Sequence, residues 1–288
     1  MSPLSLAEKA VRLNGSVGRY HRQLAEVQGV MAQHAGVFQQ IGFARRFRKE
    51  IDVALALDPN DVQALRDLLE FHLLAPGVVG GDGKKAEAVA QRIAAIDACE
   101  GFLASARMAN FRKDQKETEA MLRRAVSVKP SSYKALMALA AFQLASGRDD
   151  REAESLAQAA IKVDSGRAEA YGILATIYAS RANWSALDAL LPSAMQAVPD
   201  DLTPYYRAAE RILSDGRDPA RAEGYLRVYL AQEPEGNEPT AADAHWKLGV
   251  ALNAHGQAAN AVAEWKAAVK LDPESPARRE LKRMKEAN

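Results

Sequence analysis

The chain has 288 residues, of which 48% are hydrophobic, and its net charge is +1, from 38 Lys and Arg against 37 Asp and Glu. This balance disfavours a dedicated nucleic-acid binder, which usually carries a clear basic excess. The single Cys99 excludes an internal disulfide framework and any multi-cysteine metal site. No apolar run reaches the roughly 18 residues of a membrane span, and the first residues lack the pattern of a signal peptide.

The first predicted element is a single helix over residues 1–15. Leu6, Ala10 and Leu13 recur at the helical period and place one apolar face on it. The segment looks like the second helix of a helix pair whose first helix is absent. The chain is therefore either a truncation, or it uses this helix as a cap.

Residues 17–273 repeat themselves about every 34 residues, with gaps of 39, 32, 35, 34, 35 and 39 between equivalent positions. A Pro or a small residue follows each of these positions five residues later. The equivalent positions hold Ala54, Ile93, Ala125, Ala160, Ala194, Tyr229 and Ala268. A fixed period of this length predicts a stack of equivalent units, each packed on its neighbours, without one central core.

Two units show the pattern most clearly. The unit that ends at Pro199 reads Tyr171-x2-Leu174-Ala175-x2-Tyr178, then Leu187-x3-Leu191-x2-Ala194. The unit that ends at Pro273 reads His245-x2-Leu248-Gly249-x2-Leu252, then Ala261-x3-Trp265-x2-Ala268. Both halves of each unit have the helical period. In the second unit Gly256 provides a left-handed turn between the halves, and Gly249 allows the second helix to approach.

These two units resemble the tetratricopeptide repeat, and looser copies cover nearly the whole chain. The resemblance implies an all-α fold, a right-handed α-solenoid of about seven antiparallel helix pairs with single helices at both ends. It also implies a concave groove that binds a protein or peptide. Residues 274–288 form the expected C-terminal capping helix, with Leu281 and Met284 on one side.

Two segments near the start of the repeat depart from the period, and a further insertion follows Pro234 at residues 235–240. The first unit is about ten residues too long, with the excess near residues 31–43, where we expect longer helices. Residues 74–84 form an insertion rich in Gly, in which Val78 replaces a glycine that a phosphate-binding loop requires. The insertion is therefore read as a long ordered turn or as a loop that contacts a partner.

A basic run follows the first departure. Arg45, Arg46, Arg48 and Lys49 surround Phe47, which shares one helix face with Phe43 four residues earlier. The run predicts either a solvated face above two core phenylalanines, or a surface for an anionic partner or membrane.

The family resemblance implies which side chains face the groove, because the first helix of each pair lines it. Tyr206 and Trp246 are the expected anchors, since aromatic residues dominate binding hot spots, unless they pack against a neighbouring repeat instead. The absence of Asn at the matching places disfavours a clamp for a C-terminal carboxylate. The expected groove residues are Arg22, Glu26, Arg66, Glu70, Leu103, Arg107, Met137, Ala141, Gly172, Thr176, Tyr206, Glu210, Trp246, Val250 and Asn253.

No catalytic residue, metal ligand or cofactor is predicted. The five His residues are not spaced to share a metal, and His72 and His245 occupy positions that face a neighbouring helix. The sequence thus favours a non-enzymatic scaffold that binds a protein or peptide segment. The alternatives are self-assembly through the repeat ends, an RNA-binding helical repeat, and an enzyme.

The insertion and the overlong first unit together look similar to exported bacterial tetratricopeptide proteins of unassigned role. This resemblance implies a periplasmic location if a signal sequence precedes Met1. Without such a sequence, the expected location is the cytoplasm.

Overall fold

The computed structural model describes residues 2–147, 150–233 and 239–286, and these ranges contain sixteen α-helices, one 3-10 turn and no strand. The all-α prediction is confirmed. The chain divides into two compact units, Met1–Pro130 and Ser131–Asn288. No helix within the described ranges is both long enough and apolar enough to cross a membrane.

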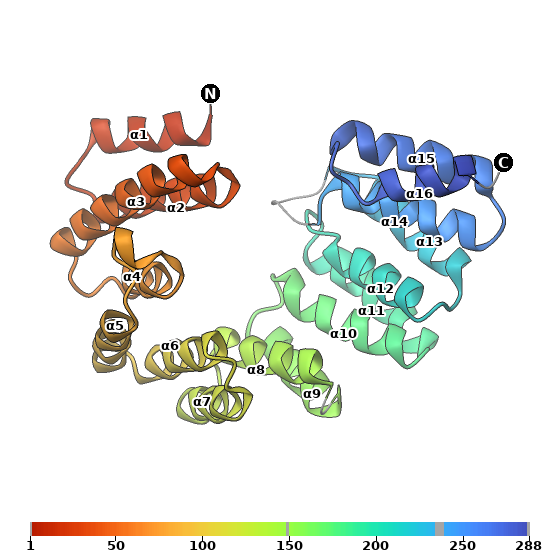
Figure 1. Cartoon of the computed structure of the whole chain (residues 1–288). Coiled ribbons are helices and arrows are strands. Elements are labelled where there is room, and N and C mark those ends of the chain that lie inside the picture. The colour runs from red at the N-terminus through yellow and green to blue at the C-terminus, as the bar shows by residue number, and fades with distance from the viewer. Residues whose placement is uncertain (1, 148–149, 234–238, 287–288) are drawn as a thin grey trace. The chain divides into compact units, whose positions relative to one another are not determined.

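The first unit contains a single helix followed by three antiparallel helix pairs, shown from red to yellow-green in Figure 1. Its elements are α1 (Pro3–Leu13), α2 (Gly18–His34), α3 (Val37–Leu57), α4 (Val62–Leu74), η1 (Gly77–Val79), α5 (Gly83–Ile96), α6 (Ala98–Phe111) and α7 (Gln115–Val128). Helix α1 packs on α2, and each later pair packs on the one before it.

The second unit contains four helix pairs followed by a single helix, shown from green to blue in Figure 1. Its elements are α8 (Tyr133–Ser146), α9 (Asp150–Val163), α10 (Ala168–Ser180), α11 (Trp184–Ala197), α12 (Thr203–Ser214), α13 (Pro219–Tyr229), α14 (Ala241–Ala254), α15 (Ala258–Leu271) and α16 (Ala277–Glu286). Helix α16 packs on α15, and its Leu281 and Met284 contact the core, as the sequence predicts.

The core follows the sequence period. The seven equivalent positions, Ala54 through Ala268, lie in the second helix of each pair and are at most 2% exposed. Five of them are Ala, a residue small enough to let two helix backbones approach, and the other two are Ile93 and Tyr229. The period of the sequence therefore identifies the positions that are buried in the second helix of each pair.

The turn inside a helix pair uses a left-handed residue in both units. Gly147, Gly216 and Gly256 have φ of 62°, 64° and 87°, as expected for glycine that ends a helix. Lys113 and Ala182 occupy the equivalent turns with φ of 61° and 51°. The turn between α6 and α7, which has no glycine, is therefore built in the same way, at a backbone cost that glycine avoids.

The last pair shows how closely two helices pack. A Cβ placed on Gly249 of α14 would lie 2.4 Å from Nε1 of Trp265 on α15, so only glycine fits there. Trp265 is 2% exposed, and its Nε1 donates a hydrogen bond to the backbone oxygen of Trp246 at 3.2 Å. The predicted approach of the second helix at Gly249 is confirmed.

Both departures near the start of the repeat are ordered, whereas the insertion at residues 235–240 lies mostly outside the described residues. Helices α2 and α3 have 17 and 21 residues, against 13 or 14 in α4 to α7, so the excess does extend both helices. In the insertion, α4 ends at Leu74, Gly80 takes φ of 111°, and the Asp82 side chain caps the N-terminus of α5. This agrees with the prediction of a long ordered turn.

Candidate functional site: the face of the first helices

We call the surface formed by the first helix of each pair the first-helix face. In the first unit, α2, α4 and α6 form it, and a pocket of about 220 Å³ opens between α4 and α6. Four of the predicted groove residues, Arg66, Glu70, Leu103 and Arg107, line this pocket together. The lining residues are Gln63, Arg66, Asp67, Leu69, Glu70, Leu103, Ala104 and Arg107.

The charges of this face pair with one another. Arg107 donates two hydrogen bonds of 2.7 Å to the carboxylate of Glu70, a bidentate geometry that joins α6 to α4. Arg66 lies 3.7 Å from Glu100, and Arg22 forms an ion pair with Glu26 one turn away. Partly exposed pairs add little stability, but they hold the side chains in one orientation and leave the pocket wall with little net charge.

Asp67, which no sequence motif marks, also lines this pocket. Burial raises the pKa of its carboxyl to about 6, and the negative charge of Glu26 adds to the shift. Gln63 donates a hydrogen bond of 3.2 Å to Oδ1 and partly offsets the rise in pKa. Asp67 therefore changes charge near neutral pH, in a cleft, as residues at functional sites often do.

A sequence signal for Asp67 exists, although it is weak. Asp67 directly follows the predicted residue Arg66 and lies one turn after Gln63, so it shares the same side of α4. Its burial depends on α2 and α6, which pack on either side, and the sequence of α4 alone does not reveal that.

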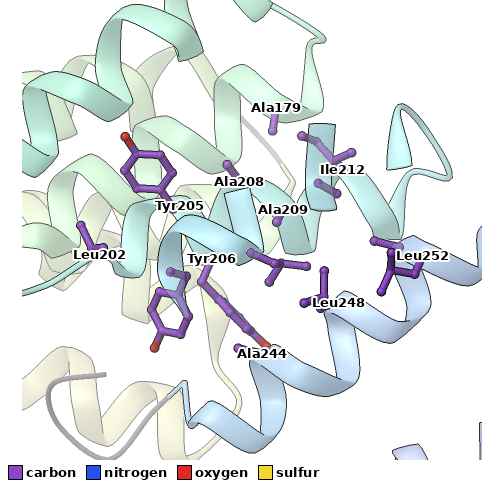
Figure 2. Packing of buried hydrophobic residues seen from close by; sticks show 14 of the residues in the cluster. Ala179, Leu202, Tyr205, Tyr206, Ala208, Ala209, Ile212, Ala244, Leu248 and Leu252 are labelled. Carbon is purple, nitrogen blue, oxygen red and sulfur yellow. The ribbon is translucent and has the colours of Figure 1, made fainter. Parts of the chain in front are cut away.

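In the second unit, Tyr206 is a core residue. It is 4% exposed, and its ring centroid lies 5.4 Å from that of Tyr229. Figure 2 shows its side chain beside Ala244 and Leu248, between α12 and α14. This position matches the alternative in which the ring packs against a neighbouring repeat, and it leaves no ring surface for a ligand.

The other expected residues of the second unit are spread along its first helices. Trp246 is half-buried and packs against the core, with the Lys247 ammonium 4.6 Å from its ring centroid. Glu210 lies 3.5 Å from the same ammonium. The half-buried residues are Met137, Thr176 and Val250, and Asn253 is exposed. Binding by any of them stays a prediction.

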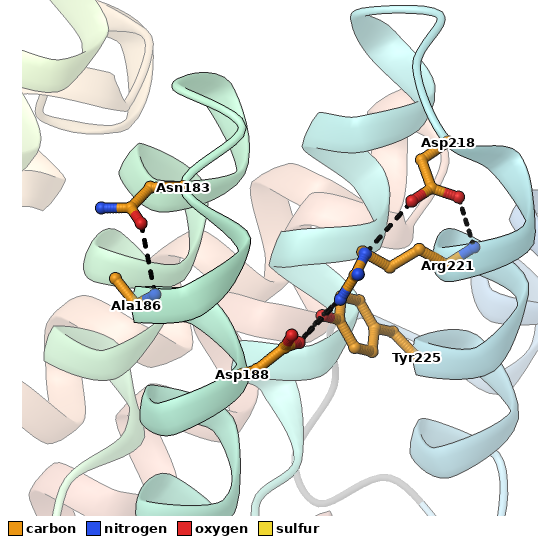
Figure 3. A network of polar contacts seen from close by, with 6 residues as sticks. All are labelled: Asn183, Ala186, Asp188, Asp218, Arg221 and Tyr225. Carbon is orange, nitrogen blue, oxygen red and sulfur yellow. Dashed lines mark hydrogen bonds and ion pairs between the residues drawn. The ribbon is translucent and has the colours of Figure 1, made fainter.

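A separate polar network lies on the second helices. Arg221 donates to Asp188 on α11 at 2.7 Å and to Asp218 at 3.2 Å, and Tyr225 donates to the same Asp188 oxygen at 3.0 Å (Figure 3). The hydrogen bond with Tyr225 and the bonds to carboxylates raise the pKa of Arg221. The network ties α13 to α11 and lies away from the expected groove residues.

The histidines also have structural partners. His72 is 4% exposed, and His245 lies 2.6 Å from Glu264 on α15. Both positions agree with the prediction that these side chains pack against a neighbouring element. Within the part of the chain that the structure describes, no group of three or more His, Cys, Asp and Glu side chains is arranged to hold a metal ion.

No family model matches the sequence, and no curated protein matches it. Solved structures do match. A tetratricopeptide repeat protein from Parabacteroides merdae is 14% identical with a TM-score of 0.54, over 90% of this chain and 97% of that one. Yeast Tom70 is 13% identical with a TM-score of 0.60, over 99% of this chain and 57% of that one. Pseudomonas aeruginosa pilF is 14% identical with a TM-score of 0.51, over 77% and 99%.

These similarities define an α-solenoid of helix pairs with the fold of tetratricopeptide repeat proteins. The resemblance read from the two clearest repeats is therefore confirmed at the level of the fold. Helical repeats of this kind present an extended surface on which partners bind.

Proposed function

We propose that this protein is a non-enzymatic scaffold that binds a protein or peptide segment on the first-helix face of its first unit. The observation that carries this proposal is the pocket between α4 and α6. There Arg66, Glu70 and Arg107, expected from the family resemblance, meet Asp67, whose pKa is raised to about 6. Fixed charges around a small pocket suit the recognition of a polar peptide.

The pocket supports binding better than catalysis. Arg107 pairs with Glu70, Arg66 lies 3.7 Å from Glu100, and the lining contains no Ser, Cys, His or Lys that could act as a nucleophile. A peptide with a cationic group beside Asp67 would favour the ionised carboxylate and lower its pKa. Peptide binding on this face is thus expected to release a proton near pH 6.

Site-specific photo-crosslinking tests the proposal. A photoreactive residue at Gln63, which lines the pocket, should capture a defined protein from a lysate of the source organism. The matched control places the same residue at Gln91, exposed on α5. The crosslink should disappear in the Arg66→Ala/Arg107→Ala variant. Equal capture from both positions, or capture that the variant retains, would refute binding at this pocket, and an RNA crosslink would favour the RNA-binding alternative.

A further inference from the structure

The two departures from the repeat period, about 30 residues apart in sequence, lie side by side in the first unit. The extended ends of α2 and α3 meet the end of α4 and the turn η1, and a groove of about 520 Å³ runs between them. The lining residues are Gly29, Ala32, Gln33, Gln40, Ile41, Ala44, Phe47, Glu70, Phe71, Leu74, Ala75, Pro76, Val78 and Val79. The groove therefore consists mainly of residues that the regular repeat does not have.

Two exposed large hydrophobic side chains line this one groove. Leu74 is 59% exposed and Val78 is 82% exposed. Nine others among the described residues lie outside its lining. Five of them share one repeat position at the end of the second helix, namely Leu57, Ile96, Val128, Val163 and Leu271, and the other four are Leu6, Leu13, Val30 and Phe111. Isolated apolar residues need no partner, whereas adjoining ones in a groove indicate an interaction surface.

The groove is held in a fixed shape. Nδ1 of the buried His72 donates to the backbone oxygen of Gly80 at 2.9 Å, and the backbone of Asp82 donates to that of His72 at 2.9 Å. The rings of Phe47 and Phe71 stack with centroids 5.7 Å apart. A partner consequently loses little free energy to ordering this loop.

The turn also depends on a glycine. A Cβ on Gly81 would lie 1.7 Å from the backbone oxygen of Ala75, so no other residue fits there. The backbone of the insertion thus returns over the end of α4 and places Val78 and Val79 along one wall of the groove.

The rim of the groove is basic. Glu70 is the one acidic residue in the lining, and Arg107 neutralises it. Arg45 is exposed on α3 one turn after the groove residue Ile41 and forms no ion pair with a described residue. The guanidinium of Arg48 lies 5.8 Å from the ring centroid of the groove residue Phe71. The lining is thus mainly apolar, and the charged side chains beside it on α3 are arginines.

We propose that this groove binds an α-helix of a partner protein whose apolar stripe is flanked by Asp and Glu. A helix is favoured because its backbone hydrogen bonds are satisfied internally, while the groove, walled by helices, offers no strand edge to pair with an extended peptide. The acidic flanks would meet Arg45 and Arg48. This surface shares only Glu70 with the pocket between α4 and α6, and the inference does not require peptide binding in that pocket.

A displayed library tests this inference. The library contains helices of about 18 residues, or five turns, with a fixed apolar stripe and random flanking positions, selected on the full chain. Selected peptides should carry Asp and Glu at the flanks in preference to Lys and Arg. Their affinity should fall about tenfold or more in the Leu74→Glu/Val78→Glu variant. Leu271→Glu, equally exposed but on α15, is the matched control and should bind as the wild type does.

The charge requirement has its own variant, Arg45→Glu, which should shift the preference toward basic flanks. The proposal is overturned if the selection yields no flank preference, or if the folded Leu74→Glu/Val78→Glu variant binds the selected peptides unchanged. It is also overturned if this variant abolishes a dimer of the wild type in sedimentation equilibrium, or its binding to phosphatidylglycerol vesicles. The Arg66→Ala variant alters the first-helix pocket and leaves the Arg107–Glu70 pair in place. It should retain the helix, which separates this test from that of the pocket.

Discussion

The first helix pair, α2 and α3, and the last pair, α14 and α15, differ in helix length and in how much apolar surface they leave exposed. In α14 and α15, two 14-residue helices meet at Gly249 and Trp265, and an apolar interior holds them together. In α2 and α3, the helices are longer, their extended ends leave apolar residues at the surface, and polar contacts hold the neighbouring insertion. The regular repeat thus packs neighbouring helices together, and the departures from it leave apolar residues exposed at the surface.

The largest predicted effect is in the last pair. Trp265→Ala removes a side chain that is 2% exposed and leaves a cavity, so the free energy of unfolding should fall by about 3–5 kcal/mol. Urea unfolding followed by far-UV circular dichroism measures this loss. Trp246→Ala, a half-buried neighbour, should cost clearly less. Equal losses for the two variants would contradict the role assigned to the interior.

A smaller loss is predicted for Gly249→Ala. The added methyl would lie 2.4 Å from Trp265 and must displace it, which should cost about 1–3 kcal/mol. The control is Gly224→Ala on α13, where a Cβ meets no atom within 4 Å and a helix-favouring residue should stabilise. If both variants changed stability in the same direction, close approach at Gly249 would not be the cause.

Substitution of Asp67 should raise the free energy of unfolding, whereas the two substitutions above should lower it. Its folded pKa of about 6 lies above the ordinary value of 3.8, so the folded state favours the protonated carboxyl. Stability should therefore fall as the pH rises from about 4 to 6, with the full penalty present above pH 6. Asp67→Asn should be more stable than the wild type at pH 7.5, and this advantage should vanish near pH 4. An advantage that does not depend on pH would refute the raised pKa.

His72 tests the polar support of the insertion. Burial lowers the pKa of its imidazole below 6.5, with Arg48 and Lys85 adding to the effect and Asp82 opposing it. Its stabilising contribution should be complete above pH 6.5 and lost as the pH falls through the lowered pKa. The protection factors of the backbone amides in residues 75–82, corrected for the intrinsic pH dependence of exchange, should therefore fall on acidification in the wild type. In His72→Gln these protection factors should depend less on pH, and an identical profile would contradict this role.

The sequence predicted those features that recur in every repeat. The seven equivalent positions are buried, Gly256 is left-handed, and Gly249 admits Trp265, because each follows from local helix geometry. The left-handed turn at Lys113 could not be predicted in this way, since it forms without the glycine that would have marked it.

Features that depend on neighbouring pairs could not be predicted in this way. Tyr206 occupies a position on the first helix like that of Arg66, yet Tyr229 and α14 bury it. Asp67 changes its pKa because α2 and α6 surround it. The apolar groove requires the two departures to lie side by side, and neither departure alone reveals a groove.

Hydrogen–deuterium exchange of the full chain, with and without a helix selected from the library, tests the central claim most directly. The account predicts slower exchange in residues 29–47 and 70–79, where the departures form the groove, and unchanged exchange in residues 246–268 of the last pair. Slower exchange in the last pair, with none in the groove, would contradict the claim that the departures from the repeat form the binding surface.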